Sequence, residues 1–253
     1  MIDLHLTTDD MPLFTKLRMT AFGEAVIEIA NDPACDEWTF SQKIRHALEK
    51  ETAARSERRM LKLLKASRTP NPAACVEDIR YLDGRTLHRD VVARLAACKW
   101  IEQTTNLLIL GSSSVGKSYL AQALVNAACR RDYTAAYYRL DDLANQLAVY
   151  QHHDPARLRF LETLHSCDVL VLDDFLTTPI TSETAAELLN ILAAREGRGS
   201  TVVTSQFDPQ DWYKSLHDAV IAESILNRIV SNAELVQLGG PNMRRHLADD
   251  TAN

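Results

Sequence analysis

Residues 111–118 read GSSSVGKS, which matches the pattern G-x-x-x-x-G-K-[ST] of phosphate-binding loops. Glycines let backbone N–H groups close around phosphate oxygens, and the N-terminus of a following helix adds positive potential. Lys117 can reach the β- and γ-phosphates, and the Ser118 hydroxyl can hold Mg²⁺. The motif therefore predicts a nucleotide site that also holds Mg²⁺. The residues expected to bind are Gly111, Ser112, Ser113, Ser114, Val115, Gly116, Lys117, Ser118 and Tyr119.

Two carboxylates come directly after the apolar run 169–172. Asp173 is expected to contact Mg²⁺, directly or through water, from the end of a buried strand. Asp174 stands where P-loop ATPases usually carry a glutamate that orients the attacking water. Asp is also common in turns that end strands, but the upstream phosphate-binding loop favours a catalytic role for both carboxylates.

The apolar run 200–204 ends in the polar residues Thr204, Ser205 and Gln206. Open α/β sheets bind their ligands at the carboxyl edge of the strands. Gln206 is therefore the first candidate for a sensor of the γ-phosphate or of the attacking water, and Thr204 is the second. A polar strand end that faces solvent is the alternative interpretation.

The elements that position these residues alternate along the second half of the chain. Strands are predicted at 106–110, 134–138, 168–172, 200–204 and 234–238, and helices at 117–130, 141–150, 155–166, 182–195 and 218–230. Nearly apolar strands that alternate with helices indicate a parallel sheet covered on both faces. The predicted fold class is α/β, with a central parallel five-stranded sheet flanked by helices and preceded by a small all-helical domain.

The first part of the chain predicts that helical domain. Pro12 suits the first turn of a helix over 10–30, and Thr39 to Gln42 has the spacing of a capping box that begins a second helix running to about Lys65. The prolines in RTPNP at 68–72 cannot continue a helix. We expect an N-terminal helical domain at 1–68, a linker and bridging helix at 69–100, and an ATPase domain at 101–253.

Composition restricts the class of protein. The 28 Lys and Arg and 34 Asp and Glu give a net charge of −6, which argues against indiscriminate binding of nucleic acid over the whole surface. The five scattered cysteines form no C-x-x-C pair and indicate neither a disulfide framework nor a zinc site. No secretory signal and no apolar run of membrane-spanning length is evident. We therefore expect a cytoplasmic protein without a membrane partner.

Two cationic segments near the C-terminus each allow two interpretations. Arg228 lies beside the apolar face of a predicted helix, where an arginine either extends to solvent and pairs locally, which is the commoner case, or takes part in catalysis. Residues 243–245 (MRR) form either a solvated tail or a segment that folds back on the nucleotide.

With these motifs placed, the chain resembles the IstB-like transposition helper ATPases of the AAA+ class, close relatives of DnaC-type helicase loaders. The likeness covers nearly the whole chain. Residues 17–25 (LRMTAFGEA) and 41–67 resemble the family's N-terminal helical region, and 99–124 and 168–176 resemble its nucleotide motifs. The most specific stretch is 199–245, with GSTVVTSQFDPQDW, AVIAESILNRIV and GGPNMRR.

The resemblance implies an AAA+ fold, binding of duplex DNA, and ATP-dependent assembly of a homo-oligomer with ATP at its subunit interfaces. It implies selection of target DNA for a cognate transposase and stimulation of that transposase. Arg228 would be an arginine finger for the ATP of a neighbouring subunit, and Arg244 a second sensor. The basic segment 41–68 would be a DNA-facing or assembly helix, with a solvated basic face as the equal alternative. The candidate DNA-binding residues are Lys43, Arg45, Arg55, Arg58, Arg59, Lys62 and Lys65.

Two positions depart from the family pattern. Ser114 stands where most relatives have glycine, which makes one backbone position of the loop less permissive. Asp174 is one methylene shorter than the usual glutamate. We therefore expect intact nucleotide binding and slow hydrolysis, as in a switch whose ATP state controls assembly.

Three other functions remain open at this point. A DnaC-type helicase loader shares the ATPase core but grips a replicative helicase through its N-terminal domain. A DNA scaffold that does not hydrolyse ATP is disfavoured by the intact Lys117, Ser118 and Asp173. A metabolic P-loop kinase is the weakest alternative, because no substrate-binding lid is evident.

Overall fold

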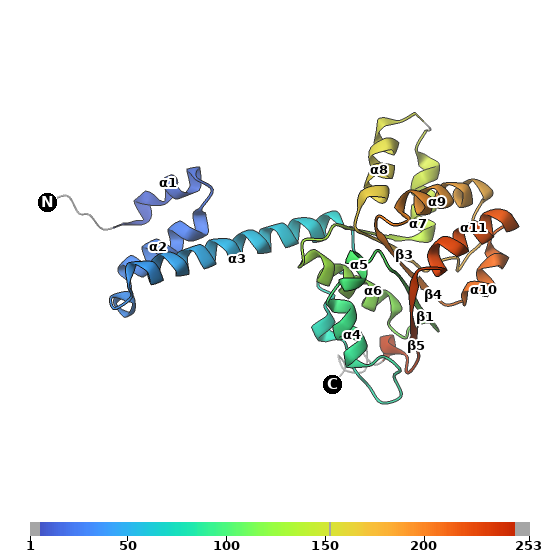
Figure 1. Cartoon of the computed structure of the whole chain (residues 1–253), viewed down its shortest axis with the longest axis horizontal. Coiled ribbons are helices and arrows are strands. Elements are labelled where there is room, and N and C mark those ends of the chain that lie inside the picture. Colours follow the sequence, from blue (N-terminus) through green and yellow to red (C-terminus); the bar gives the residue numbers. More distant parts are fainter. Residues whose placement is uncertain (1–5, 152, 246–253) are drawn as a thin grey trace. The chain divides into compact units, whose positions relative to one another are not determined.

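A computed structural model describes residues 6–151 and 153–245 of the chain. The chain divides into two compact units, Met1–Leu61 and Lys62–Asn253 (Figure 1). The domain boundary that we predicted at residue 68 falls inside the second unit, and the predicted linker and bridging helix at 69–100 lie in the second unit as well.

The first unit begins with two short helices instead of the single predicted helix over 10–30. The structure has α1 at Met11–Lys16 and α2 at Thr20–Asn31, preceded by the 3₁₀ turn Thr8–Asp10. Arg18 takes a left-handed φ of 57° between them, and the Met19 N–H donates to the Phe14 carbonyl over 2.9 Å. This bend lets Phe14 pack against α2 at Gly23, where a Cβ would overlap the Phe14 ring. A continuous helix would separate these two surfaces, so the prediction was wrong here.

The long helix α3 covers Phe40–Ala66, close to the predicted bounds, and follows the 3₁₀ turn Pro33–Cys35. Its predicted capping box is confirmed. The Thr39 N–H donates to Gln42 Oε1 over 2.8 Å, and the Gln42 N–H donates to Thr39 Oγ1 over 3.4 Å. Both bonds satisfy N–H groups that have no partner inside a helix.

The second unit contains the predicted five-stranded parallel sheet. Its strands are β1 Asn106–Gly111, β2 Ala135–Arg139, β3 Val169–Asp173, β4 Ser200–Ser205 and β5 Ala233–Leu238, in the order β2-β3-β4-β1-β5. Each pair is parallel, with Leu107 opposite Val202 in β4 and opposite Glu234 in β5. The carboxyl ends of all five strands therefore lie at one edge of the sheet.

Helices cover both faces of this sheet. They are α4 Arg89–Ala96, α5 Lys99–Glu102, α6 Lys117–Cys129, α7 Leu140–Val149, α8 Pro155–Ser166, α9 Ser182–Arg195, α10 Pro209–Trp212 and α11 Ala219–Val230, with 3₁₀ turns at Val76–Asp78 and Tyr213–Ser215. Leu108, Leu170 and Leu172 pack with residues of α7 to α11 in one buried cluster. Alternate residues face the other way, because side chains alternate along a strand. On that face the Tyr137 hydroxyl accepts from Gln122 of α6 over 3.2 Å.

One predicted helix was wrong and one helix was missed. The bridging helix that we expected within 69–100 divides into α4 and α5 at Cys98, whose φ is 60°. The short α10 and the turn that follows it, which cover the end of β4, were not predicted. Among the described residues, no helix has the length and hydropathy needed to cross a membrane.

Candidate nucleotide site

The phosphate-binding loop connects β1 to α6, as the motif predicts. β1 ends at Gly111, with φ 152°, where a Cβ would overlap the Leu238 carbonyl oxygen of the neighbouring strand. Gly116 precedes α6 with φ 99°. Ser114 lies between them at φ 64°, in the left-handed region that favours glycine. The loop thus has the sharply turned backbone that presents N–H groups to an anion.

Lys117 is buried at the start of α6, and its Nζ donates to the Ser112 carbonyl over 2.9 Å. Burial lowers the pKa of Lys117 below its ordinary value, and the negative charges of Asp174 and Asp173 oppose that shift. A buried ammonium group with only carbonyl and nearby carboxylate partners suits a polyanionic ligand.

The structure brings Ser118 and Asp173 together, as the sequence predicts. The Ser118 hydroxyl donates to Asp173 Oδ1 over 2.9 Å, and Thr204 Oγ1 from β4 donates to the same oxygen. Asp173 and Thr204 are both buried. A hydroxyl and a carboxylate are oxygen ligands that Mg²⁺ accepts while it keeps several waters and the phosphates of its nucleotide. The residues present therefore fit the predicted metal.

Asp174 has two partners that the sequence did not indicate. Its N–H donates to Thr204 Oγ1 over 3.1 Å, with a left-handed φ of 52° at Asp174. Its Oδ2 lies 3.3 Å from Nη2 of Arg139, the last residue of β2, which pairs in register with Asp173. Arg139 was missed because its closeness to Asp174 depends on that register. A basic residue at the end of a predicted strand was the one available signal.

A cavity of about 510 Å³ lies over the loop and the carboxyl edge of the sheet. It unites most of the predicted site, with the lining residues Ser113, Ser114, Gly116, Lys117, Ser118, Tyr119, Asp174, Gln206 and Arg244. Five further lining residues were not predicted: Asp78, Ile79, Arg80, Arg85 and Met243. The loop residues Gly111, Ser112 and Val115 do not line it. Gly111 allows the close approach of the neighbouring strand, the Ser112 carbonyl accepts from Lys117, and the Val115 side chain is buried.

The C-terminal segment folds back on this cavity, which decides between the two interpretations of residues 243–245. The Met243 N–H donates to the Ser114 carbonyl over 2.8 Å. Arg244 lines the cavity beside Lys117 and adds to the electrostatic field that lowers the pKa of Lys117.

Arg228 does not line the nucleotide cavity of its own chain. It lies near the end of α11 and borders a separate cavity of about 190 Å³ with Asn106 and Thr201, where β1 and β4 begin. Its Nη1 donates to the Ser224 carbonyl over 3.1 Å, and its Nε lies 3.3 Å from Glu196 Oε2. The beginnings of β1 and β4 lie at the opposite edge of the sheet from the phosphate-binding loop.

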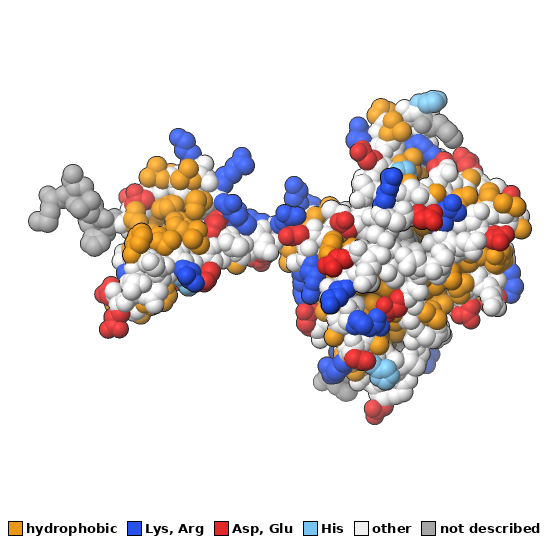
Figure 2. All heavy atoms as spheres, viewed as in Figure 1, with side chains coloured by type: hydrophobic (Ala, Val, Ile, Leu, Met, Phe, Trp, Pro, Cys, Tyr) orange, Lys and Arg blue, Asp and Glu red, His pale blue; other side chains and the backbone are white. Residues whose placement is uncertain are grey.

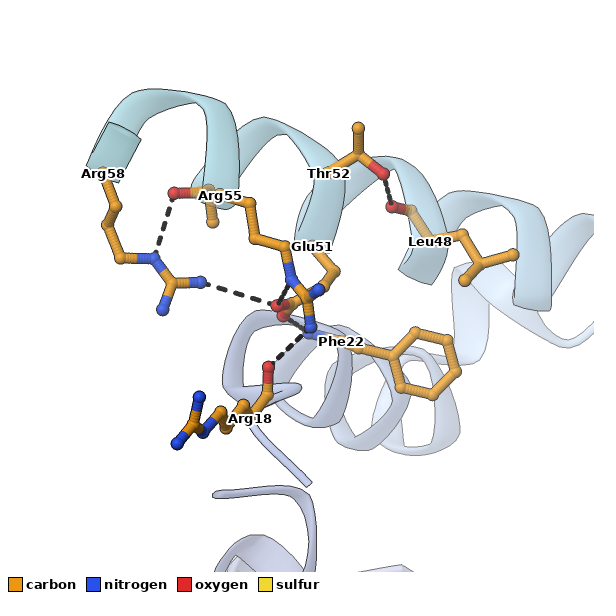
Figure 3. Close-up of polar contacts among 8 residues, drawn as sticks. Arg18, Phe22, Leu48, Glu51, Thr52, Arg55 and Arg58 are labelled. Carbon is orange, nitrogen blue, oxygen red and sulfur yellow. Dashed lines mark hydrogen bonds and ion pairs between the residues drawn. The ribbon is translucent and has the colours of Figure 1, made fainter. Parts of the chain in front are cut away.

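Two of the seven candidate DNA-binding residues are engaged inside the first unit (Figure 3). Arg55 Nε donates to Glu51 Oε1 over 2.7 Å, and Arg58 Nη2 lies 3.5 Å from the same oxygen. Arg55 Nη2 also donates to the Arg18 carbonyl over 2.7 Å. The other five, Lys43, Arg45, Arg59, Lys62 and Lys65, also lie on α3, and Figure 2 shows Lys and Arg side chains along this helix.

The fold and the site define a P-loop nucleotide-binding protein with an AAA+ fold, in which the phosphate-binding loop follows β1 and the paired carboxylates stand at the end of β3. The chain belongs to the family described as IstB-like ATP binding protein, whose signature matches residues 13–250. A relative is the insertion sequence ATP-binding protein y4pL of Sinorhizobium fredii, 32% identical over 96% of this chain and 97% of that protein. Another is the IS1162 ATP-binding protein of Pseudomonas fluorescens, 34% identical over 79% of this chain and 87% of that protein.

Solved structures agree on the fold. DnaI matches with a TM-score of 0.55 and 24% identity over 72% of this chain and 93% of that chain. The DnaC helicase loader matches with a TM-score of 0.55 and 18% identity over 66% of this chain and 97% of that chain. Replication initiator DnaA bound to AMPPCP and single-stranded DNA matches with a TM-score of 0.54 and 21% identity, over 72% of this chain and 55% of that chain. The predicted family resemblance and the AAA+ fold are confirmed.

Proposed function

We propose that this protein is an ATP-dependent, DNA-binding regulator of insertion-sequence transposition. It assembles on target DNA and recruits or stimulates a partner transposase, and slow ATP hydrolysis acts as its switch. The observation that carries this proposal is the separation of Arg228 from the nucleotide cavity of its own chain. An arginine that serves ATP from this position must serve a neighbouring subunit, which couples nucleotide binding to assembly.

The cavity supports ATP with Mg²⁺ as the ligand. When bound, they supply the phosphoanhydride bond whose hydrolysis changes the charge in the cavity. Lys117 and Arg244 offset the phosphate charge, Ser118 and Asp173 hold the metal, and the loop N–H groups bind phosphate oxygens. Asp174 orients water and accepts its proton, and Gln206 senses the phosphate at the carboxyl edge of the sheet.

Slow turnover is supported by the surroundings of Asp174. Its short side chain reaches less far than glutamate, and the ion pair with Arg139 engages one of its oxygens. An oxygen that is engaged by Arg139 is less free to turn toward the attacking water. ATP therefore persists long enough for its bound state to control assembly.

A role in transposition is supported by the relatives, which are named insertion sequence ATP-binding proteins. Contact with duplex DNA is assigned to α3, where Lys43, Arg45, Arg59, Lys62 and Lys65 supply positive charge on an acidic protein. Contacts with phosphates alone carry no sequence information, so target choice on this basis is not sequence-specific.

A helicase loader is the second candidate function, because the DnaC helicase loader shares the fold over 66% of this chain. The two functions differ in their cargo. A regulator of transposition co-purifies with a transposase, whereas a loader co-purifies with a hexameric helicase.

The first experiment is sedimentation with duplex DNA in the presence of ATP, of ADP or of no nucleotide. We expect large complexes only with ATP and DNA in the wild type, and a loss of these complexes in Arg228→Ala. Removing the guanidinium leaves the charge of the neighbour's phosphates uncompensated. Arg159→Ala, at an exposed arginine of α8, is the matched control and should assemble like the wild type.

A protein that stays monomeric under every condition would contradict the role of Arg228. It would favour a loader that assembles only with its helicase. Equal assembly of Arg228→Ala and wild type would also exclude an inter-subunit arginine.

A further inference from the structure

Arg85 is a cation of the nucleotide cavity that neither motif includes. It follows Gly84 in the loop between the turn Val76–Asp78 and α4, and its side chain lines the cavity with Lys117 and Arg244. Arg85 Nη2 donates to the Val115 carbonyl of the phosphate-binding loop over 3.1 Å, and Nη1 donates to the Arg80 carbonyl. The guanidinium is therefore held against the loop by backbone groups from two segments.

Glycines make room for this position. A Cβ on Gly116 would lie 2.7 Å from Arg85 Nη2, so the guanidinium rests against the bare side of the residue that precedes Lys117. A Cβ on Gly240 would lie 2.8 Å from the Arg85 Cα, where the backbones of the two segments meet. The neighbouring Thr86 fixes this contact, because its Oγ1 donates to the Gln237 carbonyl over 2.9 Å and accepts from the Gly239 N–H over 2.7 Å.

The charge of Arg85 has no carboxylate partner among the described residues. Its contacts are two carbonyl oxygens, and burial lowers its pKa below the ordinary value of an arginine. A partly desolvated guanidinium with N–H groups to spare binds an anion favourably, and Arg matches phosphate geometry well. The phosphate-binding loop directly beneath it indicates which anion the cavity supplies.

We propose that Arg85 is a direct ligand of the nucleotide phosphates, which acts with Lys117 and Arg244 of its own chain. The inference rests on the proposed function, in which this cavity holds ATP. Bound phosphate would then join residues 80–86 to the phosphate-binding loop through the Arg85 side chain.

The test is the affinity of the full-length protein for ATP and for ADP, measured by calorimetric titration at several salt concentrations. We expect Arg85→Gln to weaken binding of both nucleotides roughly 10- to 100-fold, the range for a lost charge-assisted hydrogen bond. Arg85→Lys keeps the charge and should recover part of this loss. The dependence of affinity on salt should become weaker in Arg85→Gln, because one screened contact is gone.

Two controls make the result decisive. Arg89→Gln changes an arginine that stacks 4.3 Å from the Tyr81 ring outside the cavity, and it should bind like the wild type. Lys117→Ala should abolish binding. An Arg85→Gln protein with wild-type affinity overturns the inference and leaves the proposed function intact, whereas a wild type that binds no ATP overturns the proposed function itself.

A purely structural role for Arg85 has its own signature. Arg85→Gln and Arg85→Lys would then lose affinity equally, with a lower Tm and an unchanged dependence on salt. That outcome would also overturn the inference, because a support for the loop needs the shape of the guanidinium and not its charge.

Discussion

Ser114 adopts a conformation that a residue with a Cβ takes at a cost. A left-handed backbone is less stable than a right-handed one by roughly 1–2 kcal/mol for residues other than glycine, and Ser114 has φ 64°. The surrounding structure fixes this conformation, since the Ser114 carbonyl accepts the Met243 N–H. The phosphate-binding loop therefore contains a local strain that glycine would relieve.

Ser114→Gly should stabilise the protein by about 1 kcal/mol, since glycine occupies the left-handed region without the steric cost but loses more chain entropy on folding. We also expect tighter ATP binding and faster phosphate release, because the loop N–H groups can adjust to the phosphates. Thermal unfolding and steady-state phosphate release measure the two effects. Ser113→Gly is the matched control and should stabilise nothing, since Ser113 has no positive φ. A lower Tm for Ser114→Gly would show that the serine side chain contributes more than the strain costs.

At the scale of elements, α2 takes its N-terminal cap from another helix. The residue before α2, Met19, offers no side-chain cap, and Glu51 of α3 accepts the Phe22 N–H over 3.1 Å (Figure 3). Glu51 is buried, and the hydrogen bond from Arg55 is the main cause that lowers its pKa from the ordinary 4.5. One carboxylate thus joins the beginning of α2 to the middle of α3.

This carboxylate predicts a pH dependence for the first unit. Because the folded pKa of Glu51 is lowered, its contribution to stability is complete above about pH 4.5 and declines as the pH falls through the folded pKa. Glu51→Gln should lower the free energy of unfolding by about 1.5–3 kcal/mol near neutral pH, the range for a hydrogen bond to a charged group, and it should weaken the acid dependence. Denaturant titration at several pH values measures both effects.

Glu57→Gln is the control, since Glu57 is exposed on the same helix. Equal stability of Glu51→Gln and Glu57→Gln at neutral pH would mean that the cap contributes nothing to folding.

The sequence was sufficient for elements whose signals are local. The phosphate-binding loop, the five strands and the capping box at Thr39 each depend on residues a few positions apart. The bend at Arg18 and the interruption at Cys98 were missed, because each depends on packing that the local pattern does not contain. Arg85 and Arg139 were missed for a related reason. Strand register and the fold of a distant loop bring them to the cavity, and neither carries a motif.

At the scale of the whole molecule, charge is divided between segments. Residues 101–253 hold 12 Lys and Arg against 19 Asp and Glu, whereas α3 is rich in Lys and Arg. In the proposed function, the acidic charge of residues 101–253 would repel DNA phosphates and leave the basic helix α3 as the favourable contact. Arg55 and Arg58 already pair with Glu51 inside the first unit, so the proposed DNA affinity would depend on the remaining basic side chains of α3.

The double variant Lys62→Ala/Lys65→Ala should therefore bind duplex DNA more weakly at low salt. Each lost phosphate contact reduces the slope of log affinity against log salt by about 0.9, so we expect the slope to fall by about 2. Fluorescence anisotropy with a duplex of arbitrary sequence measures it. Lys214→Ala, at an exposed lysine of the second unit, should leave the slope unchanged. The same slope in the double variant would exclude this end of α3 from DNA contact.

If Arg228 serves the ATP of a neighbouring subunit, as proposed, its separation from the nucleotide cavity of its own chain would also determine how an assembly grows. Two different surfaces would then meet at every junction, and subunits would join head to tail. An open row then has one terminal cavity without a neighbour's arginine, whereas a closed ring has none. Average hydrolysis per subunit would rise as rows lengthen and the terminal cavity becomes a smaller share. Short rows would keep their ATP longest. The rate of ATP hydrolysis per subunit would therefore depend on the length of the row on DNA.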